Sequence, residues 1–282
     1  MKKYSIYQIL TLILSLVVII ETLLLIHLWI IRPKKIIKIP AIPKGKIAIV
    51  IDDWGYNLDN LYLLDQIKYP FTASVLPRLD YSKAVAAELH RRGVQIILHL
   101  PMEPHEKYRL EKNTILTSMD EQTIINIIIQ DLADIHYAIG VSNHMGSKAT
   151  EDLRTMSIVL NELKRRNLFF LDSLVSPETI CSNLAAKLRV GFVKRGIFLD
   201  NKEEVEYIKG QIYKLKRKAQ MYGHAVGIGH DFNFDVTRVL DHFFDIDIGV
   251  AKGRLRLHLR HAKRVGRFIG ASHHAHAFAA AA

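Results

Sequence analysis

The chain has 282 residues, a formal net charge of +11 and one cysteine. The single cysteine excludes an internal disulfide and a thiolate-rich zinc site. Seven Lys and Arg residues and no acidic residue follow position 247, so the charge indicates a basic tail and not a nucleic-acid-binding domain.

Residues 1–31 are predicted to be a membrane anchor. The stretch from Ile6 to Ile31 is almost entirely apolar and long enough to cross a bilayer. A cleaved signal peptide has a shorter apolar core and small residues at its end, which this segment lacks, so an uncleaved signal anchor is favoured. A buried helix of a soluble domain is the alternative, for which Glu21 and His27 are the argument. Basic residues flank both ends, so they do not fix the orientation.

A linker is predicted at residues 32–45, and an alternating pattern follows it. The short apolar runs predicted as strands are IAIVI, FTASVL, VQIILHL, AIGVSN, LFFLD, GFVKRGIFL and AVGIG. Helix-period segments are predicted at 59–66, 82–92, 120–137, 151–166, 177–188 and 202–221. Asp120 precedes the third of these and is expected to be its N-cap.

Apolar strands that alternate with helices are typical of an α/β fold with a parallel sheet. About seven such units over residues 46–247 favour a closed or nearly closed (β/α) barrel, with an open doubly wound sheet as the alternative. Residues 248–282 form a basic, His- and Ala-rich tail that we expect to be disordered, although its charge also suits anionic lipid. Its cluster of His273, His274 and His276 is expected to bind metal adventitiously.

Polar and ionisable residues follow the predicted strands at equivalent places. In chain order these are Asp52, Asp53, His99, Glu103, Asn143, His144, Asp172, Ser173 and His230. The carboxyl ends of parallel strands meet at one edge, where active sites of such folds are built. The recurrence therefore predicts a single site at that edge.

Histidine and carboxylate without cysteine suit a divalent metal, most of all Zn²⁺ held by three protein ligands with one position open. Such a metal lowers the pKa of water and polarises a carbonyl, while a nearby carboxylate takes a proton and a histidine donates one. These residue types predict a metal-dependent hydrolase.

Five motifs in order, AIVIDDWG, ILHLPMEP, SNHMGS, LFFLDS and VGIGH, resemble the divergent polysaccharide deacetylase family, which is related to the NodB-type carbohydrate esterases. The similarity runs from about Lys46 to His230. It implies a deformed, NodB-like (β/α) barrel with a metal site, a glycan substrate and a place outside the cytoplasm, with the apolar helix as the membrane anchor.

The resemblance also implies roles for individual residues. Asp52 matches the general base of the NodB-type motif, Asp53 and His99 match metal ligands, and His230 matches the histidine that protonates the leaving group. The esterases place their second ligand histidine four residues after the first, where this chain has Glu103. Either Glu103 or His144 is the third ligand, and His144 is favoured.

Supporting roles are assigned to the remaining polar residues near the predicted site. Asp172 is expected to orient a histidine or to bind substrate. Asn143 and Ser173 also suit turn or helix capping, and Glu103 also suits an ion pair. Trp54 is interpreted as a core or rim residue or as a platform on which a sugar stacks.

The sequence predicts an envelope hydrolase that removes acetyl groups from a glycan by amide or ester cleavage. The alternative is a catalytically degenerate barrel that keeps the site and binds a glycan or an envelope protein. A metal-dependent amidase or phosphodiesterase is a third interpretation. No pattern in the sequence indicates an oligomeric state.

Overall fold

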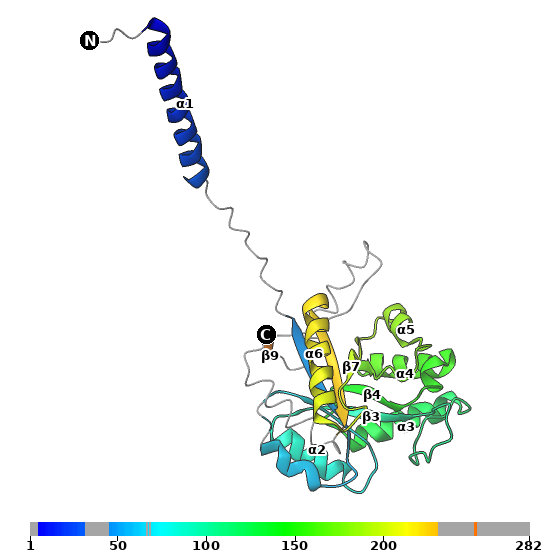
Figure 1. The fold of residues 1–282 in the computed structure, drawn as a ribbon. Helices are drawn as coiled ribbons and strands as arrows, with labels where there is room; N and C mark the ends of the chain where they lie inside the picture. The colour runs from blue at the N-terminus through cyan, green and yellow to red at the C-terminus, as the bar shows by residue number, and fades with distance from the viewer. Residues whose placement is uncertain (1–4, 32–44, 66, 68, 231–250, 253–282) are drawn as a thin grey trace. The chain divides into compact units, whose positions relative to one another are not determined.

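The computed structural model describes residues 5–31, 45–65, 67, 69–230 and 251–252 (Figure 1). They belong to an N-terminal unit, Met1–Ile42, and a second unit, Pro43–Ala282. The predicted linker and most of the predicted tail, including the cluster of His273, His274 and His276, lie outside the described residues.

Helix α1, Ile6–Ile31, is long and apolar enough to cross a membrane. Its mean hydropathy reaches 2.9, and none of its residues is buried within the protein. At ~1.5 Å per residue the helix measures ~39 Å, against ~30 Å for a bilayer core. Hydroxyls such as that of Ser15 donate to a carbonyl one turn earlier (Thr11 O, 2.8 Å), so they need no water. By length and composition α1 is a candidate span, and a signal sequence has the same properties.

The second unit alternates strands and helices, as predicted. Its strands are β1 (Lys46–Trp54), β2 (Thr72–Val75), β3 (Gln95–Met102), β4 (Gly140–Met145), β5 (Phe169–Asp172), β6 (Phe192–Lys194), β7 (Ile197–Phe198), β8 (His224–His230) and β9 (Ala251–Lys252). Its α-helices are α2 (Ser82–Arg91), α3 (Glu121–Asp134), α4 (Leu153–Arg165), α5 (Cys181–Leu188) and α6 (Val205–Tyr222), and its short 3₁₀ helices are η1 (Asp59–Asp65) and η2 (Ala149–Glu151). Asp120 caps α3 by accepting from the Thr123 amide at 2.7 Å, which confirms that prediction.

The strands form one sheet in the order β6-β5-β4-β3-β2-β1-β8-β7, and every ladder in it is parallel. The short β9 adds to the start of β1, where Lys46 pairs with Ala251. Strands β6 and β7 stand at opposite ends of this order, yet only Arg195 and Gly196 separate them in the chain. Because so few residues span only ~10 Å, the sheet curls until its two edges nearly meet. The predicted deformed barrel is confirmed.

The segment GFVKRGIFL forms two short strands, where the sequence predicted one. The Arg195 amide donates to Asp172 O of β5, and the next amide, that of Gly196, donates to Val226 O of β8. The chain thus changes partner strand between two consecutive residues. A Cβ on Gly196 would lie 3.0 Å from Val226 O, so a residue without a side chain suits this crossing.

Alternate residues along the strands face two separate apolar cores. Ile47, Ile49 and Ile51 of β1 pack in the larger cluster with residues from every α-helix of this unit. Val50 belongs to a smaller cluster made of strand residues alone, with Ala48 packed against it. Because successive side chains of a strand point to opposite faces, the smaller cluster fills the barrel interior and the larger one joins barrel to helices.

Candidate metal and catalytic site

The inward alternation of three strands ends in polar residues. Ala48 and Val50 are followed on the same face by Asp52, Ile97 is followed by His99, and Val226 and Ile228 are followed by His230. Asp52 and His230 are direct neighbours in the β1–β8 ladder. The apolar interior is therefore capped at the carboxyl edge by an ionisable layer.

Asp53 joins this layer through a bulge in β1. By alternation it would face away from Asp52, but the β1–β2 register slips between Ile51 and Trp54, and Asp53 adopts a left-handed φ of 67°. A non-glycine residue there costs about 1 kcal/mol, least for Asp and Asn. The bulge turns two consecutive carboxylates toward one site. Left-handed residues also stand at or just past the ends of β2, β4 and β5, at Arg78, Met145 and Leu174.

Asp53, His99 and His144 converge on one point. Asp53 Oδ1 lies 3.2 Å from His99 Nε2 and 3.0 Å from His144 Nδ1. One potential ligand atom from each of the three residues lies within 4.8 Å of the others. His99 is buried, whereas the side chains of Asp53 and His144 are each 13% exposed. Among the described residues, this is the group that has the composition and spacing of a three-ligand metal site.

The environments of the two adjacent carboxylates push their pKa values apart. Burial would raise the pKa of Asp53, but hydrogen bonds from His144 and His99 outweigh it and hold that pKa well below its usual value. Burial raises the pKa of Asp52 despite the nearby His99, and the charge of Asp53 adds to the rise. Asp53 thus stays ionised, while Asp52 is the readier of the two to take a proton.

One buried atom at the site fits the presence of a water beside a metal. Asp52 Oδ1 has no hydrogen-bond partner among the described residues. A buried polar atom left without a partner costs about 1–3 kcal/mol. The donor set of one carboxylate and two imidazoles is also the set that Zn²⁺ accepts. These residues therefore fit a divalent metal.

His230 has a carboxylate of its own. Asp200, two residues after β7, accepts from the His230 amide at 2.7 Å and contacts its Nδ1 at 3.1 Å. Burial would lower the pKa of His230, but the Asp200 carboxylate outweighs burial and raises it to about 9. His230 is thus protonated at neutral pH, beside Asp52 on the next strand.

Arg195 is linked to His230 through the ring of Phe198. Its guanidinium lies 3.6 Å from the centre of the Phe198 ring, and that ring stacks on His230 at 5.8 Å. The same guanidinium donates to the carbonyls of Ser173 (2.5 Å) and Leu174 (2.7 Å). The contacts join the loop after β5 to the β7–β8 side of the site.

Glu103 lies outside the group of Asp53, His99 and His144 and is held by other partners. Its carboxylate accepts from the amide and hydroxyl of Thr117 (2.6 and 2.7 Å) and from Lys148 Nζ (2.7 Å). Its carbonyl accepts from the Lys148 and Ala149 amides. Of the two candidates for third ligand, the structure brings His144 to Asp53 and His99, and it uses Glu103 to tie two loops together.

Asn143, Asp172 and Ser173 hold the ends of β4 and β5. Asn143 Oδ1 accepts from the Ser173 amide at 2.8 Å, and the Ser173 hydroxyl donates to Asn143 O at 3.0 Å. Asp172 accepts from the Leu174 amide (2.8 Å) and the Thr179 hydroxyl (2.9 Å). All three are buried, so their described contacts are those of loop anchors.

Trp54 lies in the core. Its side chain is 3% exposed and its ring stacks on Phe71 at 6.4 Å. Of the interpretations made from sequence, this placement fits packing, because a sugar platform needs an open ring face.

Four residues of the site were not singled out in the sequence. Asp200 follows an apolar run, IFL, as Asp52 and Asp172 do, but the run was merged into a longer strand. Ser74 and Ser142 lie buried within β2 and β4, where a single polar residue at an inward position was the available clue. Nothing in the local sequence of Arg195 marks it, since its role depends on the barrel crossing.

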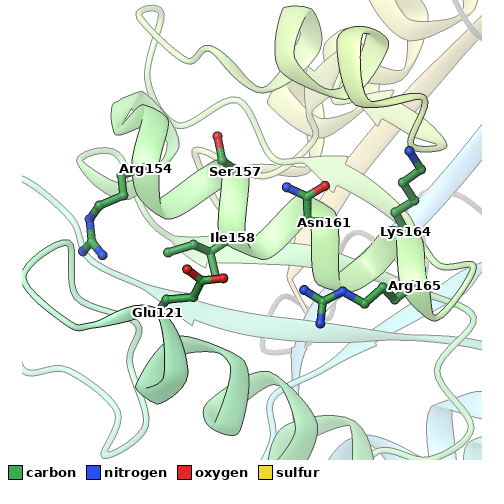
Figure 2. A pocket seen from close by; sticks show the side chains of 7 residues that line it. All are labelled: Glu121, Arg154, Ser157, Ile158, Asn161, Lys164 and Arg165. Carbon is green, nitrogen blue, oxygen red and sulfur yellow. The ribbon is translucent and has the colours of Figure 1, made fainter.

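A separate hollow of about 430 Å³ lies away from these residues. Figure 2 shows it between Glu121 of α3 and six residues of α4, including Arg154, Lys164 and Arg165. Arg154 is held by the carbonyls of Thr117 and Met119. The hollow shares no residue with the candidate site.

Comparison with known proteins places this chain among bacterial relatives. It is 37% identical to the uncharacterised protein YibQ of Escherichia coli K12 over 186 residues, which are 66% of this chain and 58% of that protein. It is 30% identical to an uncharacterised Haemophilus influenzae protein over 187 residues, 66% of this chain and 67% of that one. The chain thus spans less than two thirds of the E. coli relative.

The fold is shared with a solved structure. The crystal structure of the uncharacterised protein ATU2773 from Agrobacterium tumefaciens C58 matches with a TM-score of 0.67 at 20% identity, over 71% of this chain and 82% of that one. The family model for divergent polysaccharide deacetylases matches residues 49–247, most of the chain and the whole described barrel from within β1 to β8. This chain belongs to the divergent polysaccharide deacetylase family.

Proposed function

We propose that this protein is a metal-dependent hydrolase that removes acetyl groups from a glycan of the bacterial envelope, by amide or ester cleavage. The observation that carries the proposal is the convergence of His99 and His144 on one oxygen of Asp53. Family membership supports the substrate class. Asp53, His99 and His144 would hold the metal, for which Zn²⁺ is the best match.

When bound, the metal polarises the acetyl carbonyl and lowers the pKa of a water. Asp52 then takes the proton of the attacking water, for which its unpartnered Oδ1 and raised pKa suit it. His230 gives its proton to the departing amine or alcohol, because Asp200 keeps it charged at neutral pH. The Phe198 ring stacks on the imidazole of His230, and the Arg195 guanidinium packs on the Phe198 ring.

The test is acetate release from a panel of N- and O-acetylated oligosaccharides by the full-length protein in detergent, with Zn²⁺ and after chelation. We expect release with Zn²⁺, loss on chelation and return on adding the metal back. A protein that binds Zn²⁺ at the site and releases no acetate from any member would contradict hydrolysis. It would favour the glycan- or partner-binding alternative.

We also propose that α1 anchors the protein in a membrane with the barrel outside the cytoplasm. The length and apolar surface of α1 support the anchor, and a glycan substrate in the envelope supports the side. Protease added to spheroplasts should digest the barrel while a cytoplasmic marker stays intact. A barrel that is degraded only after lysis would contradict this orientation.

A further inference from the structure

The hollow between α3 and α4 has an excess of positive charge (Figure 2). Apart from Ile158, every residue that lines it is charged or polar. Arg154, Lys164 and Arg165 contribute three cations, against the single carboxylate of Glu121. Its volume of about 430 Å³ is within the range of ligand pockets. The balance of charge indicates an anionic occupant.

The cations belong to a row of side chains along one face of α4. Arg154, Ser157, Asn161 and Lys164 follow one another at intervals of three or four residues, and such residues share a face of a helix. At ~1.5 Å per residue, the row from Arg154 to Arg165 is about 16 Å long. The row therefore suits an extended ligand with more than one negative charge.

The helix dipole explains only part of this charge. Lys164 and Arg165 lie in the last turn of α4, where the dipole favours a cation. Arg154 lies in the first turn, where the dipole opposes one. Its guanidinium is held there by the carbonyls of Thr117 (2.9 Å) and Met119 (2.5 Å). These bonds fix the guanidinium without neutralising it, because a carbonyl carries no net charge.

The other two cations also lack a full counter-charge. Lys164 is exposed, and its ammonium has no ion pair among the described residues. The Glu162 carboxylate pairs with Arg165 (3.1 Å) and also with Arg166 (2.7 Å), so one anion serves two guanidinium groups. The lining thus keeps a net positive charge that a bound anion can neutralise.

Neutral hydrogen-bonding groups lie between the cations. The Ser157 hydroxyl donates its proton to Leu153 O at 2.6 Å, which leaves its oxygen as an acceptor. The Asn161 amide, which has no hydrogen bond to another described residue, offers both donors and an acceptor. A simple anion uses donors alone, whereas sugar hydroxyls use acceptors as well. The mixture of cations and acceptors favours an acidic sugar.

A series of contacts connects the hollow to the candidate metal site. Helices that join parallel strands run back along the sheet, so the first turns of α3 and α4 lie on the side of its carboxyl edge. Arg154 donates to the carbonyl of Thr117, whose hydroxyl donates to Glu103. The same carboxylate accepts from Lys148, four residues after His144. The Arg154 end of the row is therefore the end nearer to the site.

We propose that the hollow is an accessory subsite for sugars of the glycan substrate that carry carboxylate or phosphate groups. The inference rests on the proposed function, which makes the ligand a glycan. It adds that the substrate is acidic and that its chain continues from the metal site along α4.

The experiment measures the binding of three labelled tetrasaccharides to the full-length protein in an uncharged detergent. Tetragalacturonate carries carboxylates, phosphorylated maltotetraose carries phosphates, and maltotetraose is neutral. We expect at least one acidic probe to bind about tenfold or more tightly than the neutral probe, with an affinity that falls as salt is added. The acidic probe that binds identifies the anionic group.

Charge variants test whether this binding occurs in the hollow. Lys164→Glu should weaken binding of the acidic probe about 3- to 10-fold, because repulsion replaces attraction. Glu121→Gln should strengthen it about two- to fivefold, because it removes the carboxylate of the lining. Lys214→Glu is the matched control, since Lys214 is exposed on α6 and does not line the hollow. It should change binding by less than about twofold. The basic tail is the same in every variant.

A second measurement locates the probe without any substitution. Lysines are labelled with an amine-reactive ester and read by mass spectrometry. At a concentration about tenfold above its Kd, the acidic probe occupies about nine-tenths of the sites, so labelling of Lys164 should fall about tenfold. Labelling of Lys214 should not change.

Three outcomes overturn the subsite. The first is equal labelling of Lys164 with and without either acidic probe. The second is an equal loss of affinity in Lys164→Glu and Lys214→Glu, which would reflect net charge alone. The third is protection of Lys164 by polyglutamate but by no saccharide, which would assign the hollow to an acidic protein partner.

The two proposals fail in different ways. If an acidic probe protects Lys164 and no acetate is released from any glycan, the hydrolase proposal fails and the subsite stands. If acetate is released and neither acidic probe protects Lys164, the subsite fails and the hydrolase proposal stands.

Discussion

The site contains two groups of histidine and aspartate, which differ in the number of imidazoles that contact each carboxylate. On the β1–β3–β4 side, two imidazoles share one oxygen of Asp53. On the β7–β8 side, one imidazole has the carboxylate of Asp200 to itself. Two imidazole nitrogens then face one anionic oxygen, and such a set of three ligand atoms suits a metal cation. The dedicated carboxylate stabilises an imidazolium and so makes an acid. Under the proposed function, the ratio of carboxylate to imidazole thus separates the metal ligands from the proton donor.

The largest expected effect comes from removing the shared oxygen. Asp53→Ala should lower Zn²⁺ affinity by about 3–4 kcal/mol, on the order of 100- to 1,000-fold, because it deletes one metal ligand, and acetate release should fall to background. Isothermal titration with Zn²⁺ measures the first effect, in protein whose His273, His274 and His276 are replaced by alanine so that the tail adds no binding. Asp120→Ala is the control, since it removes the α3 cap at a cost of about 1 kcal/mol of stability and should leave Zn²⁺ binding unchanged. Tight binding by Asp53→Ala would mean that the metal lies elsewhere.

Substitution of Asp52 tests whether the two adjacent carboxylates have the same role. Asp52→Asn should retain Zn²⁺ affinity and lower the turnover number by about 10²- to 10⁴-fold, because the amide cannot accept the proton of the attacking water. Kinetics at saturating substrate, with metal content measured in parallel, check this prediction. Loss of metal with Asp52→Asn would show that the roles of the two carboxylates are reversed.

The pairing of Asp200 with His230 predicts that activity falls at alkaline pH. Because His230 must be protonated to donate, activity should hold at neutral pH and fall as the pH rises through about 9. Asp200→Asn removes the group that raises this pKa, so the fall should move toward neutral pH. Activity at alkaline pH should then drop by roughly 10- to 100-fold, with little change in mildly acidic buffer. An unchanged pH profile would separate His230 from proton donation.

The same pair makes a prediction about stability. The pKa of His230 is higher in the folded state than its ordinary 6.5. The pair therefore contributes fully below pH 6.5, and the contribution is lost as the pH rises through about 9. It amounts to about 3 kcal/mol at most. Urea unfolding of the parent and Asp200→Asn should give curves that converge at high pH, and a constant gap would contradict it.

The smallest expected effect is at Glu103, where this chain departs from the family pattern. Glu103→Gln should leave Zn²⁺ affinity within about twofold of the parent, because His144 completes the cluster. It should cost up to about 1 kcal/mol of unfolding free energy through weaker bonds to Lys148 and Thr117. A large loss of Zn²⁺ binding would make Glu103 a ligand.

Much of this architecture is legible in the sequence because buried parallel strands are short apolar runs. The same runs place Asp52, His99 and His230 at one edge, since strand ends of a parallel sheet are equivalent positions. The crossing at Arg195 and Gly196 was not predictable in this way, because apolar residues on both sides of it read as one continuous strand. Asp200 was missed for that reason.

Other features depend on geometry that a residue pattern does not record. Alternation alone would point Asp53 away from the site, and only the bulge brings it back. The choice between Glu103 and His144 as the third ligand depends on the loop contacts that hold Glu103. Ser74 and Ser142 are ordinary strand residues until two strands set their hydroxyls 2.6 Å apart.

The pairing of β1 with β8 has a consequence for the order of folding. Lys46 pairs with His224, so the first strand of the barrel can complete its pairing only after the last long strand has been synthesised. At a synthesis rate of about 5–20 residues per second, that wait lasts roughly 10 to 35 s. One edge of β1 is unpaired throughout, and an unpaired strand edge is a template for aggregation. Closure by such distant partners also makes folding slow. The chain is thus expected to need protection of its amino-terminal strand until the carboxyl-terminal part arrives.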